Sequence, residues 1–160
     1  MAQTILVPTD LRVASLNTLK LALEFLDGGP VRAVLMYAEY LDDSITDLLF
    51  YSRKTKISNS VSSEYREALE ILRNRFEAKL LGNIVIERFH GYNSNALNNF
   101  IDANKIDMVF IPKSYQLKTT SKSTNPIPLL NKLKLPVYQM EWHADNSNIT
   151  EREQLTALFN

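Results

Sequence analysis

The sequence of 160 residues contains no cysteine and only two histidines, and these absences exclude several kinds of site. Without cysteine there are no disulfides and no thiolate metal ligands, which fits a reducing compartment. His90 and His143 have no partner at a spacing typical of a metal-ligand set or a catalytic dyad. We therefore predict no metal site and no catalytic residue, and we interpret both histidines as solvated or turn-stabilising.

Neither sign of charge is in excess, because 18 basic and 18 acidic residues cancel. This balance gives no reason to expect a nucleic acid or a membrane surface as a partner. No uncharged stretch is long enough to span a bilayer, and the opening "MAQTILVPTD" has neither the basic nor the long apolar segment of a signal peptide. We expect a cytoplasmic protein that binds neither nucleic acid nor membrane.

Glycine is scarce as well: the chain has four, and none lies in "IPKSYQLKTTSKSTNP", residues 111–126. This stretch follows an apolar run typical of a strand and precedes a leucine-rich segment typical of a short helix. In α/β proteins such loops bind phosphates, and they are normally glycine-rich because their backbone N–H groups must reach the ligand. The question is whether this loop binds a nucleotide, another anion or nothing.

What the chain does contain is a regular alternation of apolar runs and helical segments, in one domain's length with 45% hydrophobic residues. Strand-like runs cover residues 3–9, 31–40, 83–89, 106–112 and 136–142. The run 83–89 alternates, which is typical of a partly exposed edge strand, whereas the runs 3–9 and 31–40 are continuous and indicate buried parallel strands. Strands alternating with helices predict a parallel sheet with right-handed crossovers.

Helical periodicity fills the intervals between these runs. The most regular stripe extends from Tyr65 to Leu80, with a cap at Ser62 or Ser63 and an end at Gly82. Shorter helices are predicted from about Val13 to Gly28, around Leu97 to Ile101 and over residues 127–134. Gly91, before the third of these helices, is expected to be required for its backbone conformation.

The tail differs from the rest, so we divide the chain into a domain at residues 1–141 and a C-terminal linker with a short helix at 142–160. In this tail Leu155, Leu158 and Phe159 form an apolar face, and Thr150 precedes Glu153 at the spacing of a capping box. The apolar face leaves open a purely structural domain whose tail docks onto a larger assembly.

Four segments, in their order and spacing, resemble the universal stress protein A family. "TILVPTD" is similar to its opening strand, which ends in an aspartate, here Asp10; "HGYNSNAL" to the glycine turn before the third helix; "KIDMVFIP" to the strand before the nucleotide loop; and "LPVYQM" to the closing strand. The likeness covers about residues 3–141. It implies a Rossmann-like α/β fold, with a single five-stranded parallel sheet in the order 3-2-1-4-5 and helices on both faces.

ATP-binding members of that family carry a G-x-x-G-x9-G-(S/T) loop after the fourth strand. Counted from that strand, the glycine positions fall on Pro112, Tyr115 and Asn125, with Pro126 at the hydroxyl position. Counted back from Pro136-Val137 instead, the last pair falls on Ser123-Thr124, and both registers lose every glycine. Proline removes an N–H donor, and a tyrosine ring stands where a phosphate needs bare backbone. The resemblance therefore implies the subgroup without this loop, for which ATP is a disfavoured cofactor.

Asp10 does remain, and the matching aspartate of ATP-binding relatives contacts the nucleoside. It has two interpretations here: it binds a ribose beside the switch point between the first and fourth strands, or it caps the turn into the first helix. One carboxylate without a second acid, base or nucleophile does not make an active site. The ligand-site residues that the resemblance implies are Thr9, Asp10, Ala38, Ile111, Lys113, Ser114, Ser123 and Thr124.

The loop is also basic, because five lysines and no acid lie between Met108 and Met140. Its lysines alternate with serines and threonines, whose hydroxyls could join the ammonium groups in holding an anion near Lys113, Ser123 and Thr124. The other interpretation is a solvated loop that these lysines keep soluble. The sequence leaves both open.

Together these features predict a non-enzymatic, universal stress protein-like module that acts in stress adaptation by homodimerising and binding a partner protein or a small anion. The alternative is a nucleotide-binding protein with slow or no ATP hydrolysis, in which Asp10 and the Lys/Ser/Thr loop replace the glycine loop. For the homodimer we expect the last strand to pair with its copy, which satisfies the free N–H and C=O groups of a sheet edge. Its interface residues would be Val137, Tyr138, Gln139, Met140 and Glu141.

Overall fold

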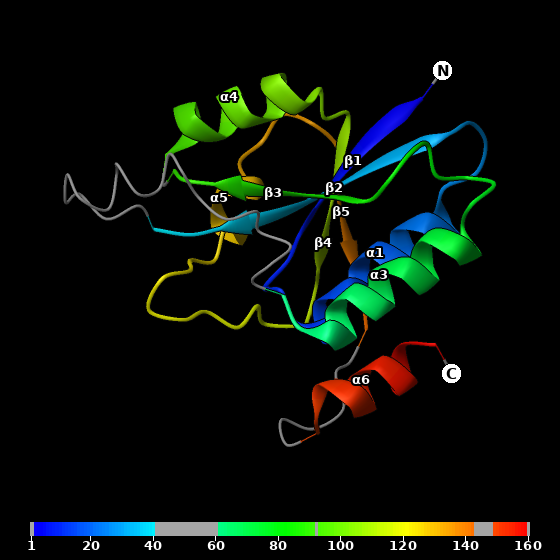
Figure 1. Cartoon of the computed structure of the whole chain (residues 1–160). Helices are drawn as coiled ribbons and strands as arrows, with labels where there is room; N and C mark the ends of the chain where they lie inside the picture. Colours follow the sequence, from blue (N-terminus) through cyan, green and yellow to red (C-terminus); the bar gives the residue numbers. More distant parts are fainter. Residues whose placement is uncertain (1, 41–60, 92, 143–148, 160) are drawn as a thin grey trace, which may run out of the picture.

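The computed structural model describes residues 2–40, 61–91, 93–142 and 149–159, which form a sheet between two layers of helices (Figure 1). The five strands are all parallel and lie in the order β3-β2-β1-β4-β5. Their bounds are Gln3–Pro8 (β1), Val31–Ala38 (β2), Val85–Phe89 (β3), Met108–Pro112 (β4) and Val137–Met140 (β5). The predicted fold and strand order are confirmed, and β3 is an edge strand as its alternation indicated.

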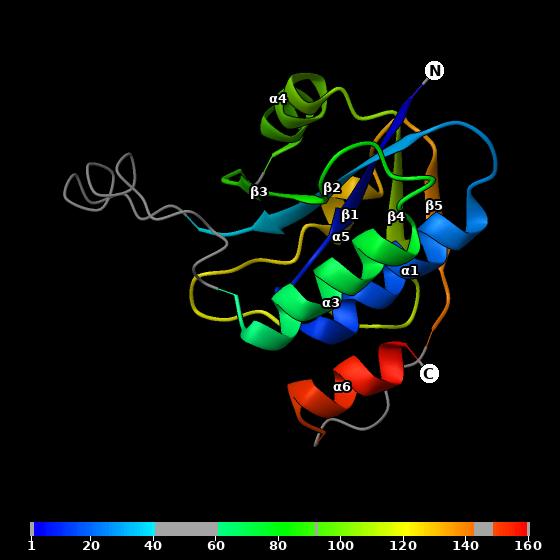
Figure 2. The same cartoon turned by 45° about the vertical axis from the view of Figure 1, so that its right-hand side comes forward.

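Helices cover both faces of this sheet (Figure 2). One layer holds α1 (Leu16–Phe25), which follows the 3-10 turn η1 (Val13–Ser15), and α3 (Ser63–Arg75). The other holds α4 (Ser94–Asn104) and α5 (Ile127–Leu130).

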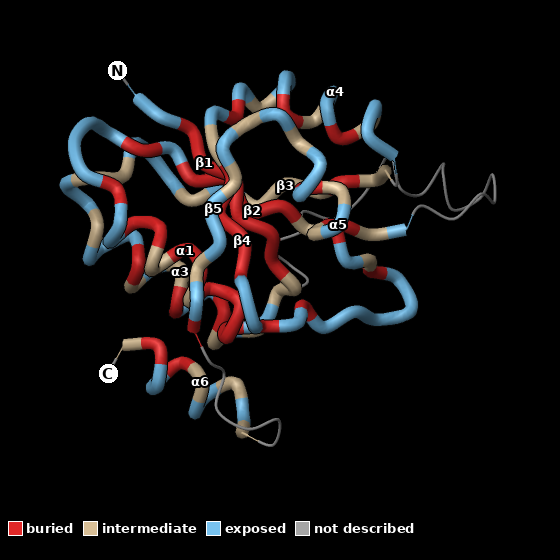
Figure 3. The backbone as a smooth tube through the Cα atoms, turned by 180° about the vertical axis from the view of Figure 1, so that it is seen from behind, coloured by how far each residue is buried: buried red, intermediate tan, exposed pale blue. Residues whose placement is uncertain are grey.

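Alternate residues of β1 enter the two cores, because successive side chains of a strand point to opposite faces. Ile5 and Val7 pack in the core under α1 and α3, whereas Leu6 packs in the core under α4 and α5. Figure 3 shows the result: burial is concentrated in the central strands and on the sides of the helices that face them.

The helix α3 ends earlier than its apolar stripe predicted. Its start is as expected, because the Ser62 hydroxyl accepts a hydrogen bond from Tyr65 N at 3.1 Å. It ends at Arg75 rather than near Gly82. Beyond it the chain turns, and Leu80 forms a parallel bridge with Val31 of β2. Leu80 packs against the core here, and it would also face the core if the helix continued. The apolar periodicity therefore could not distinguish the bridge to β2 from another helical turn.

The helix α5 is also shorter than the predicted segment 127–134, since it ends at Leu130. After Leu130 the backbone bonds span three residues, from Lys132 N to the Leu129 carbonyl at 3.0 Å and from Leu133 N to the Leu130 carbonyl at 3.2 Å, so tighter turns replace the α-helix. The strand predicted at 31–40 likewise ends at Ala38. After it, Tyr40 N donates to the Lys122 carbonyl at 2.7 Å, which joins this end of the chain to the long loop.

Gly91 is required for space rather than for an unusual backbone conformation, so that expectation was wrong. A Cβ at this position would overlap the Cβ of Ala96 in α4 and would lie 2.9 Å from Cζ of Phe89. Among the described residues, the glycines with positive φ are Gly28 and Gly82.

The tail forms a helix, α6 (Glu151–Leu158), that packs against η1 and α3. Thr150 caps it by accepting a hydrogen bond from Glu153 N at 3.1 Å, which confirms the predicted cap. Leu155 and Leu158 are 5% and 1% exposed and belong to the core under α1 and α3. The apolar face that the sequence left open to a larger assembly is therefore covered by the chain itself.

Candidate functional site

A buried hydrogen-bonded cluster at the end of β1 is centred on Thr9. The Thr9 Oγ1 lies 2.7 Å from the Tyr65 hydroxyl and 3.0 Å from Ser15 Oγ, and it accepts a hydrogen bond from Leu11 N at 3.0 Å. Tyr65 is completely buried, and this burial raises the pKa of its phenol, with the hydrogen bond to Thr9 acting in the opposite direction. The cluster thus joins β1, η1 and α3 around one hydroxyl.

Both carboxylate oxygens of Asp10, the next residue, accept hydrogen bonds from the chain itself. Oδ1 accepts from Arg12 N at 3.0 Å, so Asp10 does hold the turn before the first helix. Oδ2 accepts from the Tyr115 hydroxyl at 2.6 Å and from Lys118 N at 2.9 Å. The second oxygen is therefore bonded to the loop after β4.

Leu11 adopts a left-handed conformation, with φ of 63°. This region is unfavourable for a residue with a Cβ, so its surroundings must hold it there. The bonds of Leu11 N to Thr9 and of Arg12 N to Asp10 do so, and they close the turn in which Asp10 lies.

Tyr115 brings the loop down onto this turn. Its ring stacks on Trp142 with the centroids 4.5 Å apart and the planes at 26°. The Trp142 Nε1 donates to Thr18 Oγ1 of α1 at 2.8 Å. Both rings are 9% exposed, and burial, followed by the charge and hydrogen bond of Asp10, raises the pKa of the Tyr115 phenol. Tyr115, which occupies a glycine position of the family's phosphate-binding loop, thus lies beside Asp10.

Two further residues at this site were missed by the sequence interpretation. The Glu151 Oε2 of α6 accepts a hydrogen bond from Val13 N at 2.9 Å, so a carboxylate of the tail stabilises the start of η1. Trp142 was assigned to the linker. Its one signal in the sequence is that the chain's single tryptophan ends the strand-like run 136–142.

Alkaline pH is expected to destabilise the fold through Tyr65 and Tyr115. Both phenols have a raised pKa in the folded chain, so the folded state retains two protons that the unfolded state releases near pH 10. Their contribution is fully present below that pH and is lost as the pH rises above it. Urea unfolding from neutral pH to above about pH 10 should show this decline, with tyrosinate absorbance of both residues appearing only on unfolding. A free energy of unfolding that stays constant across this range would contradict the prediction.

Backbone N–H groups of the loop are also bonded within the protein, whereas those of a phosphate-binding loop point at the ligand. Four such bonds join loop amides to the Asp10 carboxylate, the Met140 carbonyl, the Ser123 hydroxyl and the Ala38 carbonyl. Their donors are the amides of Lys118, Lys113, Thr120 and Thr124, at 2.9, 2.9, 2.7 and 2.9 Å in that order.

The predicted ligand-site residues separate into three groups in space. Thr9, Asp10, Ala38 and Ile111 lie at or just beyond the carboxyl ends of β1, β2 and β4, which are neighbours in the sheet. Lys113 and Ser114 are exposed at the end of β4, on the side of β5. Ser123, which is 5% exposed, and Thr124 lie beside the end of β2. The strand β1 lies between β4, which Lys113 follows, and β2, beside which Ser123 and Thr124 lie. The structure therefore does not bring these three residues together, and the anion site that they would share stays a prediction.

Other polar groups show no sign of a metal centre. Within the described ranges, no three residues of the types His, Cys, Asp and Glu are grouped so that they could hold a metal ion. The His90 Nε2 lies 2.8 Å from Oε1 of Glu39, whereas His143 lies outside the described residues. None of the helices that the structure describes has the length and apolar character needed to cross a membrane.

The fold of this chain is similar to that of several proteins of known structure. No protein-family model and no curated protein sequence matches the chain. Among solved structures, UspA from Lactobacillus plantarum has a TM-score of 0.54 at 11% identity, covering 86% of this chain and 97% of that one. A universal stress protein family protein from Arabidopsis thaliana, solved with AMP bound, has a TM-score of 0.51 at 13% identity, covering 91% and 97%.

A universal stress protein in complex with cAMP has a TM-score of 0.52 at 17% identity, covering 86% of this chain and 96% of that one. The chain therefore has the universal stress protein fold over most of its length, as the four sequence segments implied. At these identities the likeness defines the fold, and the function must be argued from the site.

Proposed function

We propose that the chain is a non-enzymatic, universal stress protein-like module of the cytoplasm that acts in stress adaptation by homodimerising and binding a partner protein or a small anion. The observation that supports this proposal is the engagement of Asp10, whose two oxygens accept three hydrogen bonds from the chain itself. A ribose at Asp10 would have to displace the Tyr115 hydroxyl and Lys118 N–H. It would also meet the ring that stacks on Trp142.

The cost of that displacement is large compared with ordinary differences in ligand affinity. Hydrogen bonds to a charged group contribute roughly 1.5–3 kcal/mol each, so losing two lowers nucleotide affinity about a hundredfold or more. The lysine side chains at 113, 118 and 122 are exposed. They remain available to an anion or to an acidic surface of a partner, although ordering each one costs about 0.5–1.5 kcal/mol.

Calorimetric titration of the purified chain with ATP and magnesium, beside AMP, cAMP and inorganic phosphate, tests this proposal. We expect no micromolar binding of any nucleotide. The decisive variant is Asp10→Ala, and Asp102→Ala in α4 is its control, because Asp102 is exposed on a helix away from the site. Micromolar ATP binding that is lost only in Asp10→Ala would overturn the proposal.

That outcome would support the alternative, a nucleotide-binding protein with slow or no hydrolysis that uses Asp10 and the Lys/Ser/Thr loop in place of the glycine loop. Two observations favour it: Asp10 is retained, and solved structures with this fold contain AMP or cAMP. The variant Tyr115→Gly distinguishes the two functions further. If nucleotide affinity appears only when this ring is removed, the closed loop is what excludes the nucleotide from the natural chain.

The proposed homodimer uses β5, which is the edge strand beside β4. Val109 N donates to the Pro136 carbonyl and Lys113 N to the Met140 carbonyl, at 3.0 and 2.9 Å. Because bonding groups alternate along a strand, the N–H and C=O of Gln139 point away from β4. Beside this edge the Tyr138 ring is 38% exposed and lies 5.7 Å from the ring of Phe25, which is 57% exposed. A second copy would cover both rings.

Replacing Gln139 by proline is therefore expected to convert the dimer to a monomer. Proline removes the outward N–H and leaves the bonds to β4 intact, and edge strands tolerate it. Gln139→Ala, which keeps the N–H, should remain dimeric in sedimentation velocity at micromolar concentration. A monomeric natural chain, or a Gln139→Pro variant that still dimerises, would contradict pairing through β5.

A further inference from the structure

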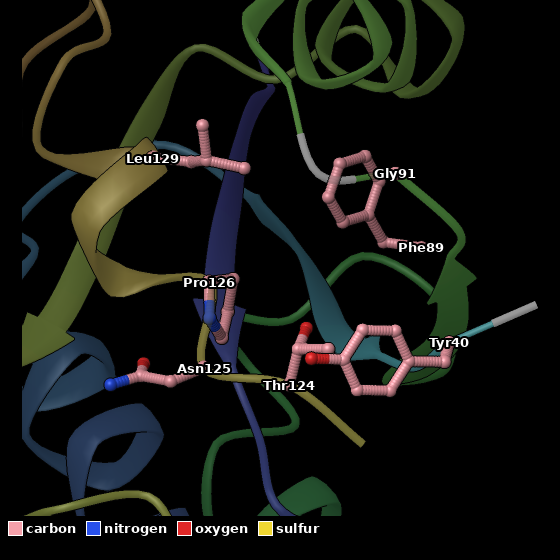
Figure 4. A pocket seen from close by; sticks show the side chains of 7 residues that line it. All are labelled: Tyr40, Phe89, Gly91, Thr124, Asn125, Pro126 and Leu129. Carbon is pink, nitrogen blue, oxygen red and sulfur yellow. The ribbon is translucent and has the colours of Figure 1, made fainter. Parts of the chain in front are cut away.

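A small cavity lies at the carboxyl ends of β2 and β3, apart from Asp10. Its lining residues come from the ends of these two strands, from the loop that enters α5 and from α5 itself, and none comes from β1 or β4 (Figure 4): Tyr40, Phe89, Gly91, Thr124, Asn125, Pro126 and Leu129. Two bonds fix the loop to the end of β2, from Thr124 N to the Ala38 carbonyl at 2.9 Å and from Tyr40 N to the Lys122 carbonyl at 2.7 Å.

The volume of this cavity, about 180 Å³, fits a single ring. In another protein an engineered apolar cavity of about 150 Å³ binds benzene, whereas pockets for drug-sized molecules have about 300–1,000 Å³. A nucleotide is too large for it. None of the lining residues is charged, so an ionised ligand would lose its hydration without finding a counter-charge.

The walls of the cavity are mainly apolar, with rings from Tyr40 and Phe89 and aliphatic groups from Pro126 and Leu129. Two hydroxyls interrupt this surface. Figure 4 shows that Tyr40 directs its hydroxyl end towards Thr124, whereas the Asn125 amide points away from the cavity. The Asn125 Oδ1 is used elsewhere, because it accepts a hydrogen bond from Ile127 N at 3.0 Å.

Tyr40 is also the most exposed of the large hydrophobic side chains in the described part of the chain, at 64%. The hydrogen bond from Tyr40 N to the Lys122 carbonyl fixes the backbone at this residue. The ring therefore extends along the cavity from a fixed Cα position. A flat ligand beside it would bury aromatic surface at a favourable stacking distance. The cavity has room for one ring, its lining residues carry no charge, and it offers the hydroxyls of Tyr40 and Thr124. These three features together indicate one class of ligand.

We propose that this cavity is a binding site for an uncharged, single-ring aromatic compound that carries one hydrogen-bonding group, with phenol as the simplest example. The ring lies between Tyr40, Phe89 and Leu129, and its hydroxyl bonds Thr124 Oγ1. This site shares Thr124 with the predicted anion site but uses neither Asp10 nor the lysines of the loop, so it goes beyond the proposed function.

The test is a titration of the full chain with phenol, followed by the backbone amide signals in nuclear magnetic resonance. We expect saturable shifts at Gly91, Thr124 and Leu129, with a dissociation constant on the order of a millimolar, as befits a ligand of so few atoms. Benzene should shift the same signals, and inorganic phosphate should leave those of Gly91 and Leu129 unshifted. Shifts that do not saturate, or that centre on Tyr115, would overturn the proposal.

Three variants locate the binding. Leu129→Trp fills the cavity and should abolish the shifts from phenol and benzene. The matched variant is Leu133→Trp. Leu133 lies beyond the end of α5 and lines a groove of about 430 Å³ against α4, which Leu129 borders as well, but it does not line the cavity. Phenol binding should survive in Leu133→Trp. Thr124→Val should weaken phenol roughly three- to tenfold and leave benzene unchanged, since it removes one neutral hydrogen bond. Loss of binding in Leu133→Trp would place the ligand in the other groove and disprove the assignment.

Discussion

Replacing Tyr65 by alanine is expected to lower the free energy of unfolding by roughly 3–5 kcal/mol, the range for a buried aromatic side chain. The ring is completely buried in the core under α1 and α3, so its removal leaves a cavity that the packed helices cannot fill. The same change leaves the Thr9 hydroxyl without its partner at 2.7 Å. The turn that carries Asp10 should loosen as a consequence.

Tyr65→Phe separates the ring from the hydroxyl in this experiment. It keeps the packing and removes the bond to Thr9, whose hydroxyl keeps its bonds to Ser15 Oγ and Leu11 N, so it should cost only about 0.5–1.5 kcal/mol. Urea unfolding monitored by the fluorescence of Trp142 and by circular dichroism measures both variants. Equal losses in Tyr65→Ala and Tyr65→Phe would mean that the ring is not packed as described.

The tail helix α6 should contribute nearly as much to stability as Tyr65. Leu158→Ala is expected to lower the free energy of unfolding by about 2–5 kcal/mol. Leu158 is 1% exposed and lies in the same core cluster as Leu16 and Tyr65. The helix that carries it also supplies Glu151, whose carboxylate bonds Val13 N at 2.9 Å. Detachment of α6 would therefore remove buried apolar surface and a contact at the start of η1 together.

Thr156→Ala is the matched control, because Thr156 lies on the exposed side of the same helix. Surface changes of this kind usually alter the free energy of unfolding by less than about 0.5 kcal/mol. If Leu158→Ala cost no more than Thr156→Ala, the tail helix would not be packed on the domain in solution. The sequence-based hypothesis of a tail that docks onto a larger assembly would then regain its support.

The sheet could be predicted from the sequence because each strand is marked by its own residues. Continuous apolar runs indicated the inner strands, and the alternating run at 83–89 indicated the edge strand β3. Helix ends were less accurate: Leu80 satisfies the apolar stripe of α3 but forms a bridge to Val31. A buried side chain is compatible with several backbone conformations. Which conformation forms depends on the backbone segment that lies nearby and can accept or donate hydrogen bonds.

At the site, the amino-acid types by themselves determined that the loop after β4 cannot form a glycine-based phosphate cradle. Side-chain size and the missing N–H of proline act locally, so no tertiary information was needed for that conclusion. The same local chemistry offered a cap of the turn as one of two interpretations of Asp10, and the structure shows the bond from Arg12 N that such a cap makes.

Only the tertiary structure decided what occupies the other oxygen of Asp10. Its bond to Tyr115 joins residues 105 positions apart, and the bond from Trp142 to Thr18 spans 124 positions. No periodicity or motif connects such pairs, because their contact depends on the order of the strands and on the path of a loop between them. The strand order brought Asp10 beneath the loop after β4. Tyr115, stacked on Trp142, then bonds the Asp10 carboxylate, so this oxygen takes part in the internal bonding of the fold.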